Sequence, residues 1–125
     1  ANQANEAFAD TRTLAASGTE DLDLAGGLTD SHGTTLTFTK IKAIIIKAAA
    51  TNTNNVQVTR PASNGLVAFM AASDGIALTP GACFALIAPD ANGIAVTAGT
   101  GDLLTITNSA GTTGVTYDIV IVGTV

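Results

Sequence analysis

Charged residues are scarce in this sequence. Asp, Glu, Lys and Arg make up 12% of its 125 residues, half the usual ~25% of a soluble domain. Five Lys and Arg residues stand against ten Asp and Glu residues, which gives a formal net charge of −5. A surface that neutralises phosphates needs clustered cations, so this composition argues against direct nucleic-acid binding. The surface must instead be built largely from Thr, Asn, Ser, Gly and Ala, which are small, neutral and easily dehydrated.

Residue types that often carry chemistry are also rare. The chain has one cysteine, one histidine, one tyrosine and no tryptophan. Cys83 has no partner for an internal disulfide, and the apolar run around it predicts a small buried hydrophobe. Zinc sites need clustered Cys and His, which this sequence does not supply. Carbohydrate platforms usually use Trp or Tyr, so only Tyr117 remains for that role. We therefore predict no catalytic residues, no cofactor and no metal.

Long hydrophobic runs are missing as well. The most apolar stretch, residues 41–50, is interrupted by lysines and is too short to span a bilayer. The first six residues have neither a basic n-region nor an apolar h-region, so no secretory signal is expected. We expect a product made in a cytoplasm, without a membrane partner.

Turn residues punctuate the chain at short, regular intervals. Gly, Asn, Asp, Pro and Ser cluster between runs rich in Ile, Val, Leu, Thr and Phe. This spacing predicts an all-β antiparallel sandwich of about 8–10 short strands, with a jelly-roll-like arrangement. The expected strands are 11–15, 21–24, 35–48, 56–60, 66–71, 76–78, 83–88, 94–97, 103–107 and 115–122. The last of these is apolar on both faces towards its end, which is typical of a central strand covered on both sides.

Residues 35–48 change the phase of their alternation. Leu36 and Phe38 share one parity, whereas Ile41 and Ile45 lie on the other. A β-bulge near residues 39–41 would explain the change. A short helix is the alternative, because several apolar residues also fit helical spacing. The three consecutive isoleucines and the Thr-rich beginning favour a strand.

The sequence divides into an N-terminal arm, residues 1–10, and a single sandwich domain, residues 11–125. The arm is polar and rich in alanine, and it could be frayed, form a short helix or dock on a neighbour. Acidic residues are concentrated in the first quarter of the chain, which could meet a basic protein partner. The residues that we expect to contact a partner are Asn2, Glu6, Phe8 and Asp10.

Three short motifs resemble functional sites. Residues 30–32, Asp-Ser-His, contain the letters of a hydrolase triad, but a working triad converges from separate elements. We predict a turn here, in which Asp30 and Ser31 hydrogen-bond to the local backbone. Residues 90–93 have the opening spacing of a calcium loop without its downstream Glu, so a turn is expected and a weak calcium site stays open. Residues 99–102 lack the Lys of a phosphate loop and predict a hairpin turn.

Three pairs of stretches carry a resemblance to known proteins. They are 23–30 (DLAGGLTD) leading into 36–43 (LTFTKIKA), 80–84 (PGACF) with 88–90 (APD), and 97–104 (TAGTGDLL) followed by 117–123 (YDIVIVG). In order and spacing they resemble small β-sandwich virion proteins of tailed bacteriophages, of the kind that decorate or cement the head. The resemblance covers residues 20–123 and consists of turn-and-strand patterns without a chemical signature.

This resemblance implies a structural role outside the capsid. The protein would bridge subunits of the major capsid protein, stabilise the expanded head, and act as a homo-oligomer, a dimer or a trimer. Its location would be the outer surface of the virion, after assembly in the host cytoplasm. The alternative is a receptor- or glycan-binding module of a tail or head fibre. An enzyme is not expected.

Overall fold

The computed structural model describes residues 3–125. These residues form eleven β-strands, and no helix among them is long and apolar enough to cross a membrane. The strands are β1 (Glu6–Leu14), β2 (Thr19–Asp23), β3 (Ala25–Thr29), β4 (Thr35–Thr37), β5 (Lys40–Ala48), β6 (Val56–Thr59), β7 (Gly75–Leu78), β8 (Cys83–Ile87), β9 (Ile94–Ala95), β10 (Leu103–Asn108) and β11 (Val115–Thr124).

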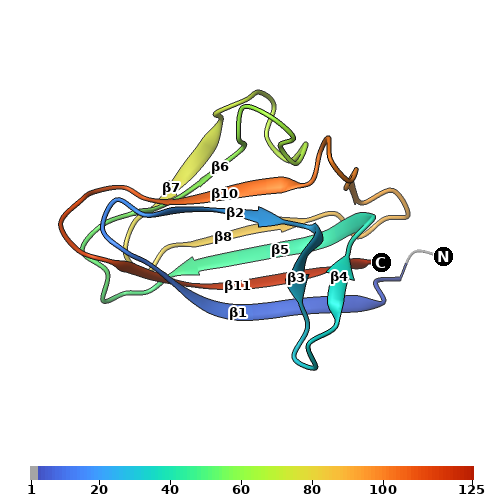
Figure 1. Cartoon of the computed structure of the whole chain (residues 1–125), viewed down its shortest axis with the longest axis horizontal. Coiled ribbons are helices and arrows are strands. Elements are labelled where there is room, and N and C mark those ends of the chain that lie inside the picture. The colour runs from blue at the N-terminus through green and yellow to red at the C-terminus, as the bar shows by residue number, and fades with distance from the viewer. Residues whose placement is uncertain (1–2) are drawn as a thin grey trace.

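Two antiparallel sheets form the body of the molecule (Figure 1). The sheet that we name sheet A has the order β1-β11-β5-β8, and the short β9 pairs with one end of β5. The second sheet, sheet B, has the order β2-β10-β6-β7. A hairpin of β3 and β4 stands apart from both sheets. The predicted all-β antiparallel fold is therefore confirmed.

The pairing of the eight strands that build sheets A and B, apart from the short β9, is nested. In chain order, β1 pairs with β11, β2 with β10, β5 with β8, and β6 with β7. The first strand thus meets the last, and the innermost pair is adjacent in sequence. Two further pairings, β11 with β5 and β10 with β6, join these pairs into the two sheets. The chain runs as one long antiparallel hairpin that has been rolled into two layers.

The core lies between the two sheets and follows the alternation of the strands. On β11, Tyr117, Ile119 and Ile121 are buried, and on β5 the buried residues include Ile44 and Ile46. Each such isoleucine contributes about 1.5–3 kcal/mol when it is fully buried. The phase of the alternation thus fixes which face of each strand points inward.

Residues 35–48 form strands, so the helical alternative is wrong. The run is divided, however: β4 belongs to the outlying hairpin, and β5 belongs to sheet A. The register with β11 then shifts between Val122 and Gly123, which leaves Lys42 as the extra residue of a bulge. Gly123 is required there, because a Cβ atom would lie 2.3 Å from the carbonyl oxygen of Lys40. The bulge thus lies just after the predicted residues 39–41, and the prediction that Ile45 faces the core is wrong. Ile41 is buried, but beyond the bulge the buried residues are Ile44, Ile46 and Ala48, at the same parity as Leu36 and Phe38.

Two segments differ from the sequence predictions in a way that matters for the surface. Strand β1 begins at Glu6, so residues 6–10, expected in an N-terminal arm, pair with β11 instead. Residues 66–71, expected as a strand, form turns and bends. In that segment the guanidinium of Arg60 donates to the carbonyls of Phe69 and Met70, which are therefore not offered to a neighbouring strand.

Candidate interaction surfaces

The Asp30-Ser31-His32 motif lies in the exposed turn between β3 and β4. Asp30 Oδ1 accepts hydrogen bonds from the backbone N–H groups of His32, at 2.8 Å, and of Thr34, at 2.9 Å. The Thr34 bond is the main cause that lowers the pKa of Asp30 below its ordinary value. The carboxylate therefore acts as a turn cap, as predicted from the sequence.

The loop after β8 has a similar internal cap. Asp90 Oδ1 accepts from the N–H groups of Asn92 and Gly93, both at 3.0 Å. The ammonium groups of two lysines of β5 donate to backbone carbonyls of this loop: Lys42 to Asp90, and Lys40 to Ala91 at 3.0 Å. Two positive charges thus lie against this loop and would repel a further cation there. Among residues 3–125 there is no group of three His, Cys, Asp or Glu side chains placed to hold a metal ion.

Residues 99–102 form the expected hairpin turn. Thr97 and Gly101 make an antiparallel bridge, and Gly99 N–H donates to Asp102 Oδ2 at 2.8 Å. Gly99 has a φ of 76°, which a side chain would disfavour. Asp102 is buried, and its carboxylate stabilises the turn by accepting this hydrogen bond.

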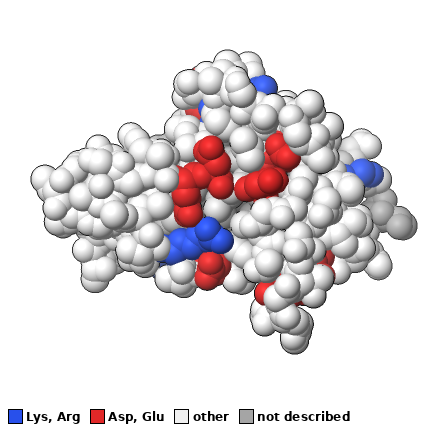
Figure 2. Space-filling view, in the orientation of Figure 1, with Lys and Arg blue, Asp and Glu red and all other residues white. Residues whose placement is uncertain are grey.

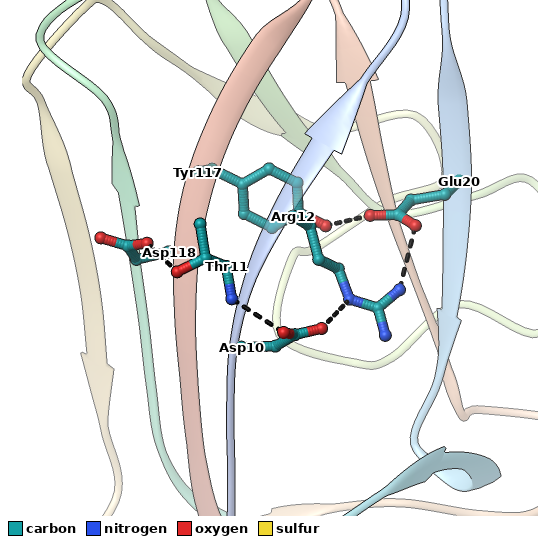
Figure 3. Close-up of polar contacts among 6 residues, drawn as sticks. All are labelled: Asp10, Thr11, Arg12, Glu20, Tyr117 and Asp118. Atoms are coloured by element: carbon teal, nitrogen blue, oxygen red, sulfur yellow. Dashed lines mark hydrogen bonds and ion pairs between the residues drawn. The ribbon is translucent and has the colours of Figure 1, made fainter.

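A polar cluster joins the edge of sheet A to the edge of sheet B (Figure 3). Arg12 of β1 donates to Asp10 Oδ2 and to Glu20 Oε2 of β2, each at 3.1 Å. Its guanidinium also lies 5.7 Å from the centre of the Phe8 ring. The hydroxyl of Tyr117 donates to the other oxygen of Glu20. These contacts close one open side of the sandwich with charged groups.

Acidic groups gather on this same side. Figure 2 shows red atoms in the middle of the face, around a single basic group. Among residues 3–125, the Arg12 pairs are the only ion pairs, so the acids that do not contact Arg12 remain without a cation. Several acids of the first quarter of the chain, Asp10 of β1 and Glu20, Asp21 and Asp23 of β2, thus lie on two strands at neighbouring edges of the two sheets.

Of the four residues that we expected to contact a partner, the three that the structure describes do not form one surface. Asn2 lies outside the described residues. Phe8 is only 4% exposed and belongs to the core. Asp10 is exposed but paired with Arg12, and Glu6 is partly buried at the start of β1. Phe8 was chosen because its polar neighbours suggested an arm, whereas β-pairing places it on the inner face.

The loop of residues 66–72 presents the most exposed apolar side chain of the described chain. Met70 is 96% exposed and Val67 is 65% exposed. The loop is nevertheless held firmly: Phe69 stacks on Phe84 of β8 at 6.1 Å between ring centroids, and Ala71 N–H donates to Asp74 at 3.0 Å. It covers the side of the sandwich opposite to the charged cluster (Figure 1). The loop therefore holds two exposed apolar side chains, Met70 and Val67, in a fixed position on the surface.

The outer face of sheet A is also apolar. Strand β11 is central, as predicted, but its outer face is not covered within the chain: Val120 is 36% exposed, and its cross-strand neighbour Ile45 is 37% exposed. Ile87 of β8 is 56% exposed on the same sheet. The predicted double coverage is thus absent from the described residues of this single chain.

Cys83 lies on the outer face of sheet A and is exposed. The prediction of a buried cysteine was wrong because β8 is an edge strand, and its apolar residues alternate between the core and solvent. Tyr117, which the sequence left as the one candidate for stacking on a sugar, is fully buried and cannot take that role.

No model of a known protein family matches this chain, and no curated protein matches its sequence.

Proposed function

We propose that this protein is a structural virion protein that decorates or cements the outside of a tailed-phage capsid. In this role it bridges neighbouring subunits of the major capsid protein and stabilises the expanded head. It acts by binding and performs no catalysis. The observation that carries the proposal is the fixed loop of residues 66–72, which holds Met70 and Val67 in solvent.

The nested strand pairing supports the assignment. Pairing of first with last and second with second-last, in two four-stranded walls, is the arrangement from which we infer a jelly roll. Jelly rolls occur in viral capsid proteins and also in lectins and cupins. The fold alone therefore does not decide the function, and the surface must be considered with it.

The composition of the surface supports the same role. Thr, Asn and backbone groups give neutral hydrogen bonds of about 1 kcal/mol each, and the apolar loop adds buried area. A single copy would hold the shell weakly. On a capsid lattice, several such contacts engage together and their combined strength is much greater.

The test is binding to expanded heads that lack the protein, measured by co-sedimentation. We expect saturable binding at a fixed ratio to the capsid subunit, and loss of binding when Val67→Asp or Met70→Asp places a charge on the loop. Val125→Asp, at a valine that is 47% exposed, serves as the control and should bind normally. If the wild-type protein does not bind heads, the cement function is refuted, and a tail or fibre adhesin takes its place.

A further inference from the structure

The outward-facing residues of sheet A lie in three regular rows across the four strands β1, β11, β5 and β8. The register defines them as Ala7, Val122, Ala43 and Ile87; Ala9, Val120, Ile45 and Ala85; and Thr11, Asp118, Lys47 and Cys83. Two rows are wholly apolar, and the third carries one acid and one base on the two central strands. All of these side chains are exposed or partly exposed.

We propose that this outer face of sheet A binds a second copy of this chain, face to face, about a two-fold axis. The axis runs parallel to the strands and lies between β11 and β5. Each β11 then packs over β5 of the second copy, and each β1 over β8. The proposal deepens the cement function and rests on it for its biological setting, because a dimer presents two 66–72 loops to two capsid subunits. The dimer itself forms without a capsid.

The charges on the third row select the second copy as the occupant and fix the direction of the axis. Rotation about this axis places Asp118 opposite Lys47 of the second copy, and Lys47 opposite its Asp118. Two opposite-charge contacts therefore form by symmetry. A two-fold axis across the strands would place both charges over apolar residues or over like charges. Lys47 has no carboxylate within 4.0 Å in the described chain, so its charge is available.

The apolar rows are self-complementary under the same rotation. At the centre of the second row, Val120 lies opposite Ile45 of the second copy. At the edge of that row, Ala9 lies opposite Ala85 of the second copy, so no two large residues meet there. Four strands about 4.8 Å apart and five residues at about 3.4 Å each give a footprint of about 330 Å². The standard interface buries about 800 Å² per partner. We therefore expect a dimer that dissociates on dilution.

Sedimentation velocity over a range of concentrations tests the proposal without any capsid. We expect a reversible monomer–dimer equilibrium for the wild-type chain. Ile45→Asp and Val120→Asp should be monomeric, with wild-type circular dichroism as evidence of folding. Val67→Asp, which changes an exposed valine outside sheet A, is the matched control and should dimerise normally.

A charge exchange makes the test specific for the axis. Asp118→Lys alone places Lys opposite Lys, and Lys47→Asp alone places Asp opposite Asp, so each variant should dimerise at least about tenfold more weakly. When the two variants are mixed, every facing pair is again opposite in charge, and heterodimers should form with near wild-type affinity. This rescue requires contact between copies and does not follow from a change within one chain.

Three results would overturn the proposal: a wild-type chain that is monomeric at every concentration, a dimer that Ile45→Asp leaves intact, or the absence of heterodimers in the mixture. Failure of the cement function gives a different result, namely normal dimers that do not bind heads.

Discussion

Tyr117 is the residue at which the core and the charged cluster meet. Its ring is buried, and its hydroxyl donates to Glu20, whose other oxygen accepts from Arg12. Burial is the main cause that raises the pKa of Tyr117 far above its ordinary value, and the Glu20 carboxylate adds to the effect. The folded protein therefore keeps this hydroxyl protonated.

We expect the free energy of unfolding to fall as the pH rises above about 10, the pKa of an unfolded tyrosine. Because the folded-state pKa is raised, the stabilisation is complete below that pH and is lost as the pH rises through the folded value. Tyr117 is the only tyrosine of the chain, so its tyrosinate absorbance reports on this group alone. It should appear together with the loss of circular dichroism. Ionisation near pH 10 in a folded chain would contradict the assignment.

Tyr117→Phe should destabilise the protein by about 1.5–3 kcal/mol, because it removes a hydrogen bond to a charged acceptor in a mostly buried place. Urea unfolding measures this change. Thr105→Val is a useful comparison, since it removes the hydroxyl that donates to Asp21 at 2.5 Å on an exposed face and should cost less. Equal losses for the two variants would show that the burial of Tyr117 does not strengthen its contact.

Among the elements, two buried asparagines connect the loops at one end of the sandwich. Asn54 Nδ2 donates to Asn108 Oδ1 at 3.1 Å, and both side chains donate to the carbonyl of Thr113. Asn108 also donates to the carbonyl of Ala15 at 3.0 Å. The sequence does not predict this network, because its members are far apart in the chain and each looks like ordinary turn material.

Asn108→Ala should cost about 1–3 kcal/mol, since the buried amide of Asn54 would lose an acceptor and the part-buried carbonyls of Ala15 and Thr113 would lose a donor. Thermal or urea unfolding provides the measurement. Asn92→Ala is the matched control: Asn92 is exposed, and its backbone N–H makes the bond to Asp90. A similar stability for both variants would mean that the buried network contributes nothing.

The β3–β4 turn should respond to acid. The lowered pKa of Asp30 means that its carboxylate stabilises the turn above the ordinary value of 3.8, and that this support is lost as the pH falls through the lowered folded-state pKa. Amide NMR shifts of His32 and Thr34 should follow that titration, and Asp30→Asn should abolish it. An Asp30 pKa at or above its ordinary value would contradict the assignment.

For the whole molecule, the turn spacing was sufficient to predict most of the fold. The expected strands at 56–60, 83–88 and 103–107 agree with β6, β8 and β10 to within one residue at each end. Two failures have physical causes. In residues 6–10, the acids Glu6 and Asp10 lie on the same side of β1 as the buried Phe8. The alternation of apolar and polar residues that would predict a strand is therefore absent from this part of the sequence. Residues 66–71 are as apolar as a strand, but Arg60 holds them as a loop.

The interaction surfaces were less predictable than the strands. Whether an apolar side chain is covered depends on which strand is at the edge and what packs outside it, and neither is contained in the local pattern. The sequence predicted a strand covered on both faces around Val120 and a strand around Met70, whereas the structure leaves both side chains exposed. The same two residues belong to the two surfaces through which we propose that the protein assembles.

The most direct measurement of the cement function is the temperature at which expanded, protein-free heads are disrupted, with and without added protein. We expect the wild-type chain to raise this temperature and to reach a plateau at its binding ratio. Met70→Asp should leave the temperature unchanged, although the variant is folded and dimeric. An unchanged disruption temperature with saturating wild-type protein would contradict the role that we propose.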